Sequence, residues 1–194
     1  MGMTIHYSGR FKEGASLSKM IREVQDVAEA NNWKFHVFNP EFPHDIPPGV
    51  DKNLYGIIFS PPECEPVCLT FLSNKRMTGP TQVEHFLEAP NEEERKFAYM
   101  LFTKTQYAGT DIHKRIIHLF KYLDKQYFDE FEVHDEGKYW ETGDSHILEK
   151  TYRKYCNAID SFNDALQNLP NKEGENLEEY LMRLARMVNK GKKD

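Results

Sequence analysis

The pattern of hydrophobic positions predicts the same order of elements in two stretches of the chain, residues 4–38 and 104–134. Each stretch opens with a short strand that ends in tyrosine, a small residue and glycine, so that Tyr7 and Tyr107 hold equivalent positions. Each continues through a helix whose apolar residues recur every three to four positions, the period of one buried helix face. Each closes on a second short strand. We therefore predict two related strand-helix-strand units.

Residues 54–59 and 67–71, between the two units, have the composition of two further strands. The Pro61-Pro62 pair separates them, and because proline cannot continue a strand ladder, it marks a loop. These residues predict a β-hairpin inserted between the units. Residues 78–96 lack a clean period and are expected to form an exposed connection with a short helix.

From Ser145 onward the pattern changes to a helical one. Apolar residues then alternate steps of four and three, the spacing of a coiled-coil seam. The members of this seam are Leu148, Tyr152, Tyr155, Ile159, Phe162, Leu166 and Leu169. A shorter helix with Leu177, Leu181 and Leu184 repeats the seam after Pro170. We predict an antiparallel helical hairpin whose seam is buried inside the monomer; a seam facing outward would instead imply a dimer or a protein partner.

These elements together predict an α+β fold. The two units are expected to pack in a ferredoxin-like arrangement, with both first strands side by side in the middle and both helices on one face. Residues 1–143 would form the sheet domain with its internal repeat. Residues 144–194 would form the helical hairpin, packed on that domain as one compact unit.

Composition narrows the class of protein. With 194 residues, 39% hydrophobic and 29% charged, the chain is of ordinary globular type. The net charge of -6 argues against broad nucleic-acid binding through phosphate neutralisation. The sequence has no apolar run near the roughly 20 residues of a membrane span and no signal-peptide pattern, so we expect a cytoplasmic protein without membrane contact. Cys64 and Cys68 would lie about 13 Å apart on one strand and stay reduced.

Alternation along the strands predicts where chemistry is found, because successive side chains of a strand point to opposite faces. Ile5, Tyr7 and Leu101 belong to the face covered by the helices. The opposite face combines apolar Ala98, Met100 and Phe102 at one end with polar residues at the other, as ligand pockets do. Its polar members are Thr4, His6, Ser8, His36, Lys104, Gln106, Glu132 and His134.

Three residues of this face are candidate catalytic groups: His6 as a base, Glu132 as its orienting partner and Lys104 as the stabiliser of negative charge. Histidine and glutamate side chains are also common metal ligands. Because the sequence has no recognised spacing of metal ligands, no metal site is predicted. The other candidate ligand-binding residues are Thr4, Ser8, Arg10, Gln106, His36, His134 and Trp140. Trp140 is a recognition anchor or a roof over the core, and we favour the roof.

Two functions remain open. The first is binding of a small molecule, anion or other ion on the polar sheet face near His6, with hydrolase or transferase chemistry as an option. The second is a non-enzymatic protein-protein interaction module, or a homodimer, that uses the helical hairpin or the basic face of helix 111–125. The sequence assigns no cofactor. The sequence lacks G-x-S-x-G, P-loop and H-E-x-x-H motifs, which argues against membership of the common hydrolase, NTPase and metalloprotease classes.

Overall fold

The computed structural model describes residues 3–44, 52–170 and 174–190. The strands are β1 (Thr4–Phe11), β2 (Lys34–Val37), β3 (Tyr55–Ser60), β4 (Val67–Phe71), β5 (Leu101–Lys104) and β6 (Phe128–Asp135). The helices are α1 (Leu17–Ala30), α2 (Pro80–His85), α3 (Glu92–Lys96), the 3-10 turn η1 (Phe97–Tyr99), α4 (Gly109–Tyr127), α5 (Tyr139–Thr142), α6 (Ser145–Asn168) and α7 (Leu177–Lys190). The predicted α+β class is confirmed. In the described part of the chain, every helix is too short or too polar to cross a membrane.

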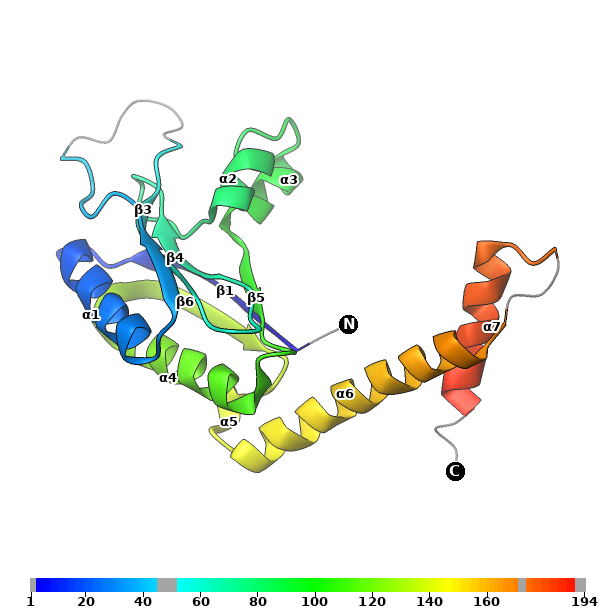
Figure 1. The fold of residues 1–194 in the computed structure, drawn as a ribbon. Coiled ribbons are helices and arrows are strands. Elements are labelled where there is room, and N and C mark those ends of the chain that lie inside the picture. The colour runs from blue at the N-terminus through cyan, green and yellow to red at the C-terminus, as the bar shows by residue number, and fades with distance from the viewer. Residues whose placement is uncertain (1–2, 45–51, 171–173, 191–194) are drawn as a thin grey trace.

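The strands form two antiparallel sheets, of order β5-β1-β6 and β2-β3-β4 (Figure 1). Residues 75–77, which follow β4, join the two sheets. The backbone N–H of Met77 donates to the carbonyl of Gly9 at 2.9 Å, and that of Phe11 donates to the carbonyl of Lys75 at 2.7 Å. Strand β1 is therefore paired along both edges, which places it at the centre of the molecule.

The ferredoxin-like arrangement is not confirmed. Strands β1 and β5, the first strands of the two predicted units, are neighbours as expected. However, β5 lies at an edge of its sheet, and β2 belongs to the other sheet. The inserted hairpin of β3 and β4 explains the difference, because β3 provides β2 with its hydrogen-bonding partner.

The proposed equivalence of Tyr7 and Tyr107 is wrong. Tyr7 lies opposite Leu101 in the sheet, and β1 continues past Gly9 to Phe11 instead of turning into a helix. Tyr107 follows the end of β5 and is 69% exposed, whereas Tyr7 is buried. The short motif was misleading because only Gly109, with a positive φ of 84°, makes the predicted turn into a helix.

Helices α1 and α4 pack on the same side of the strands (Figure 1). Ser16 caps α1 by accepting a hydrogen bond from the backbone N–H of Lys19. Each helix turns an apolar stripe to the core, including Met20 and Val24 in α1 and Phe120 in α4. Tyr7 meets Phe120 edge to face, with ring centroids 4.8 Å apart. The sheet face that bears Tyr7 is thus the core face.

Helix α6 begins against the body and then runs away from it, and α7 crosses its distal part (Figure 1). Leu148, near the start of α6, is fully buried. Phe162 and Leu166, near its end, are each 40% exposed. The two predicted helices are present, but burial of the whole seam inside the monomer is wrong. With 24 residues, α6 is about 36 Å long and extends beyond the surface of α4 and α5 on which it begins.

This division of α6 predicts a contrast between two substitutions. Leu148→Ala removes a fully buried side chain and should lower the free energy of unfolding by about 2–5 kcal/mol. Phe162→Ala removes a partly exposed side chain and should lower it by less than about 1 kcal/mol. Urea unfolding at low protein concentration measures both. Equal losses for the two variants would show that the distal part of α6 packs on the body after all.

Candidate functional site

The side chains of β1 alternate between the core and the outer face of the sheet. Ile5 and Tyr7 are buried on the helix side. His6 is exposed and Ser8 half-buried on the opposite, outer face. The register of β1 with β6 shifts between Ser8 and Arg10, so alternation across the pair holds only up to this point.

A hollow of about 450 Å³ lies on the outer face of the β5-β1-β6 sheet. One side consists of β1 and β6, and the other of β5 with the α2 and η1 segments. The hollow is lined by His6, Tyr7, Ser8, Gln82, Phe86, Phe97, Met100, Leu101, Phe102, Glu132, Val133 and His134. Its exposed lining is mainly apolar, with polar groups contributed chiefly by β1 and β6.

Register fixes the polar side of the hollow. His6 stands directly between Phe102 of β5 and His134 of β6. Its ring centroid lies 6.2 Å from that of Phe102 and 6.1 Å from that of His134. Glu132 pairs with Ser8 in the next row on the same face. The imidazoles of His6 and His134, the hydroxyl of Ser8 and the carboxylate of Glu132 therefore lie on one sheet face, beside the ring of Phe102.

Four of the residues predicted from alternation, His6, Ser8, Glu132 and His134, line this hollow. Lys104 lies two pairs along β5 from Phe102, opposite the buried Thr4. The backbone N–H of Lys104 donates to the carboxylate of Glu65 at 3.0 Å. Neither Thr4 nor Lys104 is among the lining residues.

Other predicted residues lie elsewhere. Gln106 is buried, and its carbonyl accepts a hydrogen bond from the hydroxyl of Tyr152 on α6. Arg10 donates to the carbonyl of Asn74 at 3.1 Å. His36 belongs to the second sheet, on β2, so its expected place on the same sheet face as His6 and His134 is wrong. These histidines were grouped because both units were assumed to share one sheet.

Trp140 lies on α5, away from the hollow. Its ring centroid is 5.9 Å from that of Phe131, and the ammonium of Lys121 lies 5.6 Å from its ring. The indole is partly buried and packs against the main core. This position matches a roof over the core rather than a wall of the hollow.

The roles of His6 as a base and of Glu132 as its orienting partner stay predictions. Within the described residues, no hydrogen bond joins the two side chains, which belong to different rows of the sheet. The same part of the chain contains no group of three or more His, Cys, Asp or Glu residues placed to hold a metal ion.

The far wall of the hollow was missed by sequence reasoning. Gln82 and Phe86 belong to residues 78–96, which were expected to form an exposed connection, and Phe97 follows them in η1. Met100 and Phe102 were expected at the apolar end and do line the hollow. Ala98 was expected beside them but is fully buried in a second core cluster. Residues 78–96 contain a single aromatic residue, Phe86, so the sequence carries little signal for this wall.

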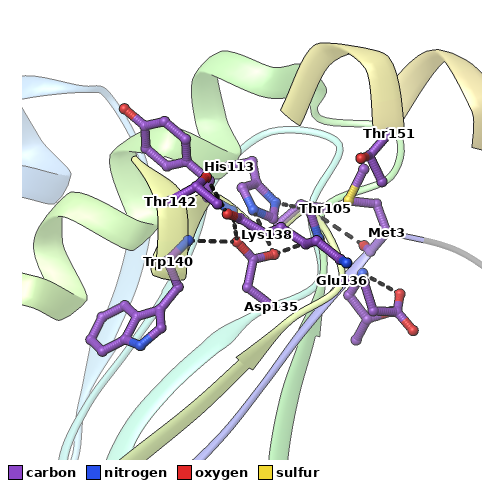
Figure 2. A network of polar contacts seen from close by, with 12 residues as sticks. Met3, Thr105, His113, Asp135, Glu136, Lys138, Trp140, Thr142 and Thr151 are labelled. Atoms are coloured by element: carbon purple, nitrogen blue, oxygen red, sulfur yellow. Dashed lines mark hydrogen bonds and ion pairs between the residues drawn. The ribbon is translucent and has the colours of Figure 1, made fainter. Parts of the chain in front are cut away.

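A buried polar network lies at the end of β6 (Figure 2). One carboxylate oxygen of Asp135 accepts the backbone N–H of Gly137 at 2.7 Å, and the other accepts those of Tyr139 at 2.7 Å and Trp140 at 3.0 Å. Nε2 of His113 lies 3.0 Å from this carboxylate. The Asp135 network therefore ties α4 and α5 to the sheet, and it was not foreseen because none of its members forms a local motif.

The Asp135 network resembles a catalytic triad in composition but not in access. Nδ1 of His113 lies 2.8 Å from the hydroxyl oxygen of Thr105, and both residues are fully buried. The hydroxyl is closed off from solvent in this structure, and it also lies within hydrogen-bond distance of the carbonyl of Met3. Burial acts to raise the pKa of Asp135, but the His113 imidazole and the N–H donors of Trp140 and Gly137 outweigh burial and lower this pKa.

Asp135→Asn should destabilise the fold by about 3–5 kcal/mol, because an amide cannot accept all the N–H groups that the carboxylate satisfies. A lowered folded-state pKa means that the ionised carboxylate stabilises the protein above its unfolded pKa of about 3.9, and that this is lost as pH falls through the folded value. Urea unfolding from pH 7 to pH 3 should show the difference between wild type and variant shrinking in acid.

Asp129→Asn on the same strand is the matched control, because Asp129 is exposed. It should change stability by no more than about 0.5 kcal/mol. An Asp135→Asn variant as stable as this control would contradict the structural role of the network.

The basic face of α4 is engaged within the chain. Lys114 lies 3.0 Å from the carboxylate of Asp111, and His118 lies 3.2 Å from the hydroxyl of Tyr139. Lys121 lies over Trp140, as described above. The use of this face for a protein partner stays a prediction.

The cysteines offer no reactive thiol at the hollow. Cys64, Cys68 and Cys156 are free, which confirms the predicted absence of a bridge between Cys64 and Cys68. Burial raises the pKa of the Cys64 thiol to about 11 and that of Cys68 to about 12. Both remain protonated at neutral pH, and a protonated thiol is a poor nucleophile.

Comparison with protein-family models, with curated proteins and with solved structures finds no match to this chain. The functional assignment therefore depends on the geometry of the hollow and on the exposed surfaces of the protein.

Proposed function

We propose that this protein binds a small amphipathic molecule in the hollow on the outer sheet face, without transforming it chemically. The ligand has an apolar, preferably aromatic, body and a cationic head. The observation that carries the proposal is the combination, within one hollow, of an exposed apolar wall and a polar side that contains Glu132.

The apolar wall supports the first half of the ligand. Phe97, Met100 and Phe102 are 47%, 53% and 50% exposed, although each has a large apolar side chain. Clustered exposed apolar residues mark binding surfaces more often than scattered ones do. A volume near 450 Å³ lies within the range of about 300–1,000 Å³ typical of small-molecule sites. An aromatic ring in contact with this wall would remove both partners from water.

The polar side supports the second half. Among the described lining residues, Glu132 provides the one carboxylate, and it lies in the row next to His6 and His134. A neutral imidazole both donates and accepts hydrogen bonds, so the histidines accommodate an ammonium or another donor group. A carboxylate near an ammonium adds attraction, although an exposed pair of this kind contributes only about 0.2–1 kcal/mol.

A set of three indoles tests the proposal on the full chain. Tryptamine carries an ammonium, indole has no charge, and indole-3-acetate carries a carboxylate. We expect all three to move the ring-proton NMR signals of His6 and His134, with tryptamine binding about two- to fivefold more tightly than indole. Glu132→Gln should abolish the preference for tryptamine, and Phe102→Ala should weaken all three by about two- to tenfold.

Glu130→Gln is the matched control on the same strand. Glu130 is absent from the lining of the hollow and lies 3.9 Å from Arg10. This variant should keep the order of the three affinities. The proposal fails if none of the indoles shifts the signals of His6 and His134, or if Glu132→Gln leaves the preference for tryptamine intact.

A further inference from the structure

Strand β6 is an edge strand of the β5-β1-β6 sheet. Within the described part of the chain, β1 is the one strand that pairs with it. The elements that lie against β6 besides β1 are chiefly α4 and α5. An edge strand presents backbone N–H and C=O groups that another extended chain can bind.

The ladder between β1 and β6 shows which backbone groups of β6 point outward. Just after β6, the N–H of Glu136 donates to a carbonyl of β1 at 3.2 Å. Along an antiparallel ladder, hydrogen-bonded pairs alternate with pairs that are not bonded. His134 and Glu132 therefore bond to β1, whereas the N–H and C=O of Val133 and the C=O of Phe131 point away from it.

These three outward groups form a free backbone edge. Within the described residues, no hydrogen bond outside the β1 ladder reaches Val133 or Phe131. The next outward carbonyl, that of Asp135, accepts the N–H of Lys138 at 3.0 Å. The free edge thus ends at the turn into α5, and it suits a short extended segment rather than a long strand.

The outer flank of this edge is acidic. Glu132 is exposed and, in the part of the chain that the structure describes, has no ion pair within 4 Å. Glu130 has a side chain that is 78% exposed and lies 3.9 Å from Arg10, at the limit of an ion pair. Asp129 is exposed as well. Opposite charges on neighbouring strands attract, so this flank favours basic side chains on an added strand.

The other flank of the edge is apolar. Phe131 and Val133 turn partly buried side chains to the helix side, where the ring of Trp140 lies 5.9 Å from that of Phe131. Because side chains alternate along a strand, an added strand would place every second residue on this apolar flank. The sequence that fits both flanks therefore alternates basic and apolar residues.

The same charges argue against a second copy of this chain as the occupant. Two β6 edges paired about a two-fold axis would bring the carboxylates of Glu130 and Glu132 close to their own copies. Like charges directly opposite each other destabilise a strand pair. The net charge of -6 adds to this repulsion.

We propose that the free edge of β6 binds an extended segment of another protein with alternating basic and apolar residues, which adds a fourth strand to the β5-β1-β6 sheet. The outward groups of Val133 supply the central pair of hydrogen bonds. Glu132 selects a basic side chain on the outer flank, and Phe131 and Trp140 contact an apolar one on the other. This proposal stands apart from the hollow, whose walls are not needed for strand addition.

The probe is a capped five-residue peptide, lysine-valine-lysine-valine-lysine, added to the full chain. We expect a dissociation constant of about 0.1–1 mM. At saturation, exchange of the Val133 amide hydrogen should slow at least about tenfold, because this N–H gains a partner. The amides of Glu132 and His134, which already bond to β1, should change little. NMR resolves these amides one by one.

Two altered peptides separate strand addition from simple charge attraction. N-methylation of both valines keeps every charge but removes the N–H groups that would face Val133, and it should abolish binding. Glutamate in place of the lysines should abolish binding as well. If the N-methylated peptide binds as tightly as the parent peptide, attraction to carboxylates is the whole effect and the proposal is wrong.

On the protein, Glu130→Lys combined with Glu132→Lys should weaken the parent peptide at least about fivefold, because both side chains are exposed and acidic. Glu92→Lys on α3 is the control for net charge and should have no more than about a small effect, twofold at most. Phe102→Ala, on the far edge of the sheet, should leave peptide binding unchanged even though it weakens the indoles. Failure of one proposal is thus distinguishable from failure of the other.

Three results would overturn the proposal. Exchange of the Val133 amide could be unaffected by the parent peptide at about 1 mM. The double lysine variant could bind this peptide as tightly as the wild type does. Sedimentation could reveal a dimer in which the Val133 amide is protected without any peptide, which would make a second copy the occupant of the edge.

Discussion

Strand β1 is hydrogen-bonded along both of its edges, and this pairing positions the neighbouring strands and the residues of the hollow. β5 and residues 75–77 occupy one edge, and β6 occupies the other. The hydroxyl of Tyr7 donates to the carbonyl of Cys68 at 3.1 Å and accepts the N–H of the same residue at 2.9 Å. This contact joins β1 to β4 of the other sheet. Because β1 is fixed in this way, its alternation decides which residues enter the core and which face the hollow.

The Asp135 network connects the β5-β1-β6 sheet to the C-terminal helices. Asp135 ends β6, and its carboxylate holds the first backbone N–H groups of α5, after which the chain enters α6. Gly137 is required there, since an added Cβ would lie 2.6 Å from Leu148 and 2.9 Å from the imidazole of His113. The buried carboxylate thus holds α5 on the sheet, and the packing of Leu148 in the core holds the start of α6.

Successive side chains of a strand point to opposite faces, whichever strands it pairs with. This alternation along β1 and β6 was enough to predict that His6, Ser8, Glu132 and His134 share a face. The same pattern cannot tell which sheet a strand joins, and His36 was misplaced for this reason. Hydrogen-bond partners of edge strands are decided by contacts distant in sequence, here between β2 and the inserted hairpin. The apolar seam of α6 predicted a helix correctly, but its period does not reveal that the supporting body ends before Phe162.

We propose different roles for the two faces of the β5-β1-β6 sheet, one packed on helices and the other available to a ligand. Acylation of histidines by diethyl pyrocarbonate, read residue by residue with mass spectrometry, tests this proposal most directly. We expect His6 and His134 to react in the free protein and the buried His113 to stay unmodified. Saturating tryptamine should protect His6 and His134 while His36 stays reactive. Equal protection of His36, or continued reactivity of His6 and His134 under saturating tryptamine, would contradict it.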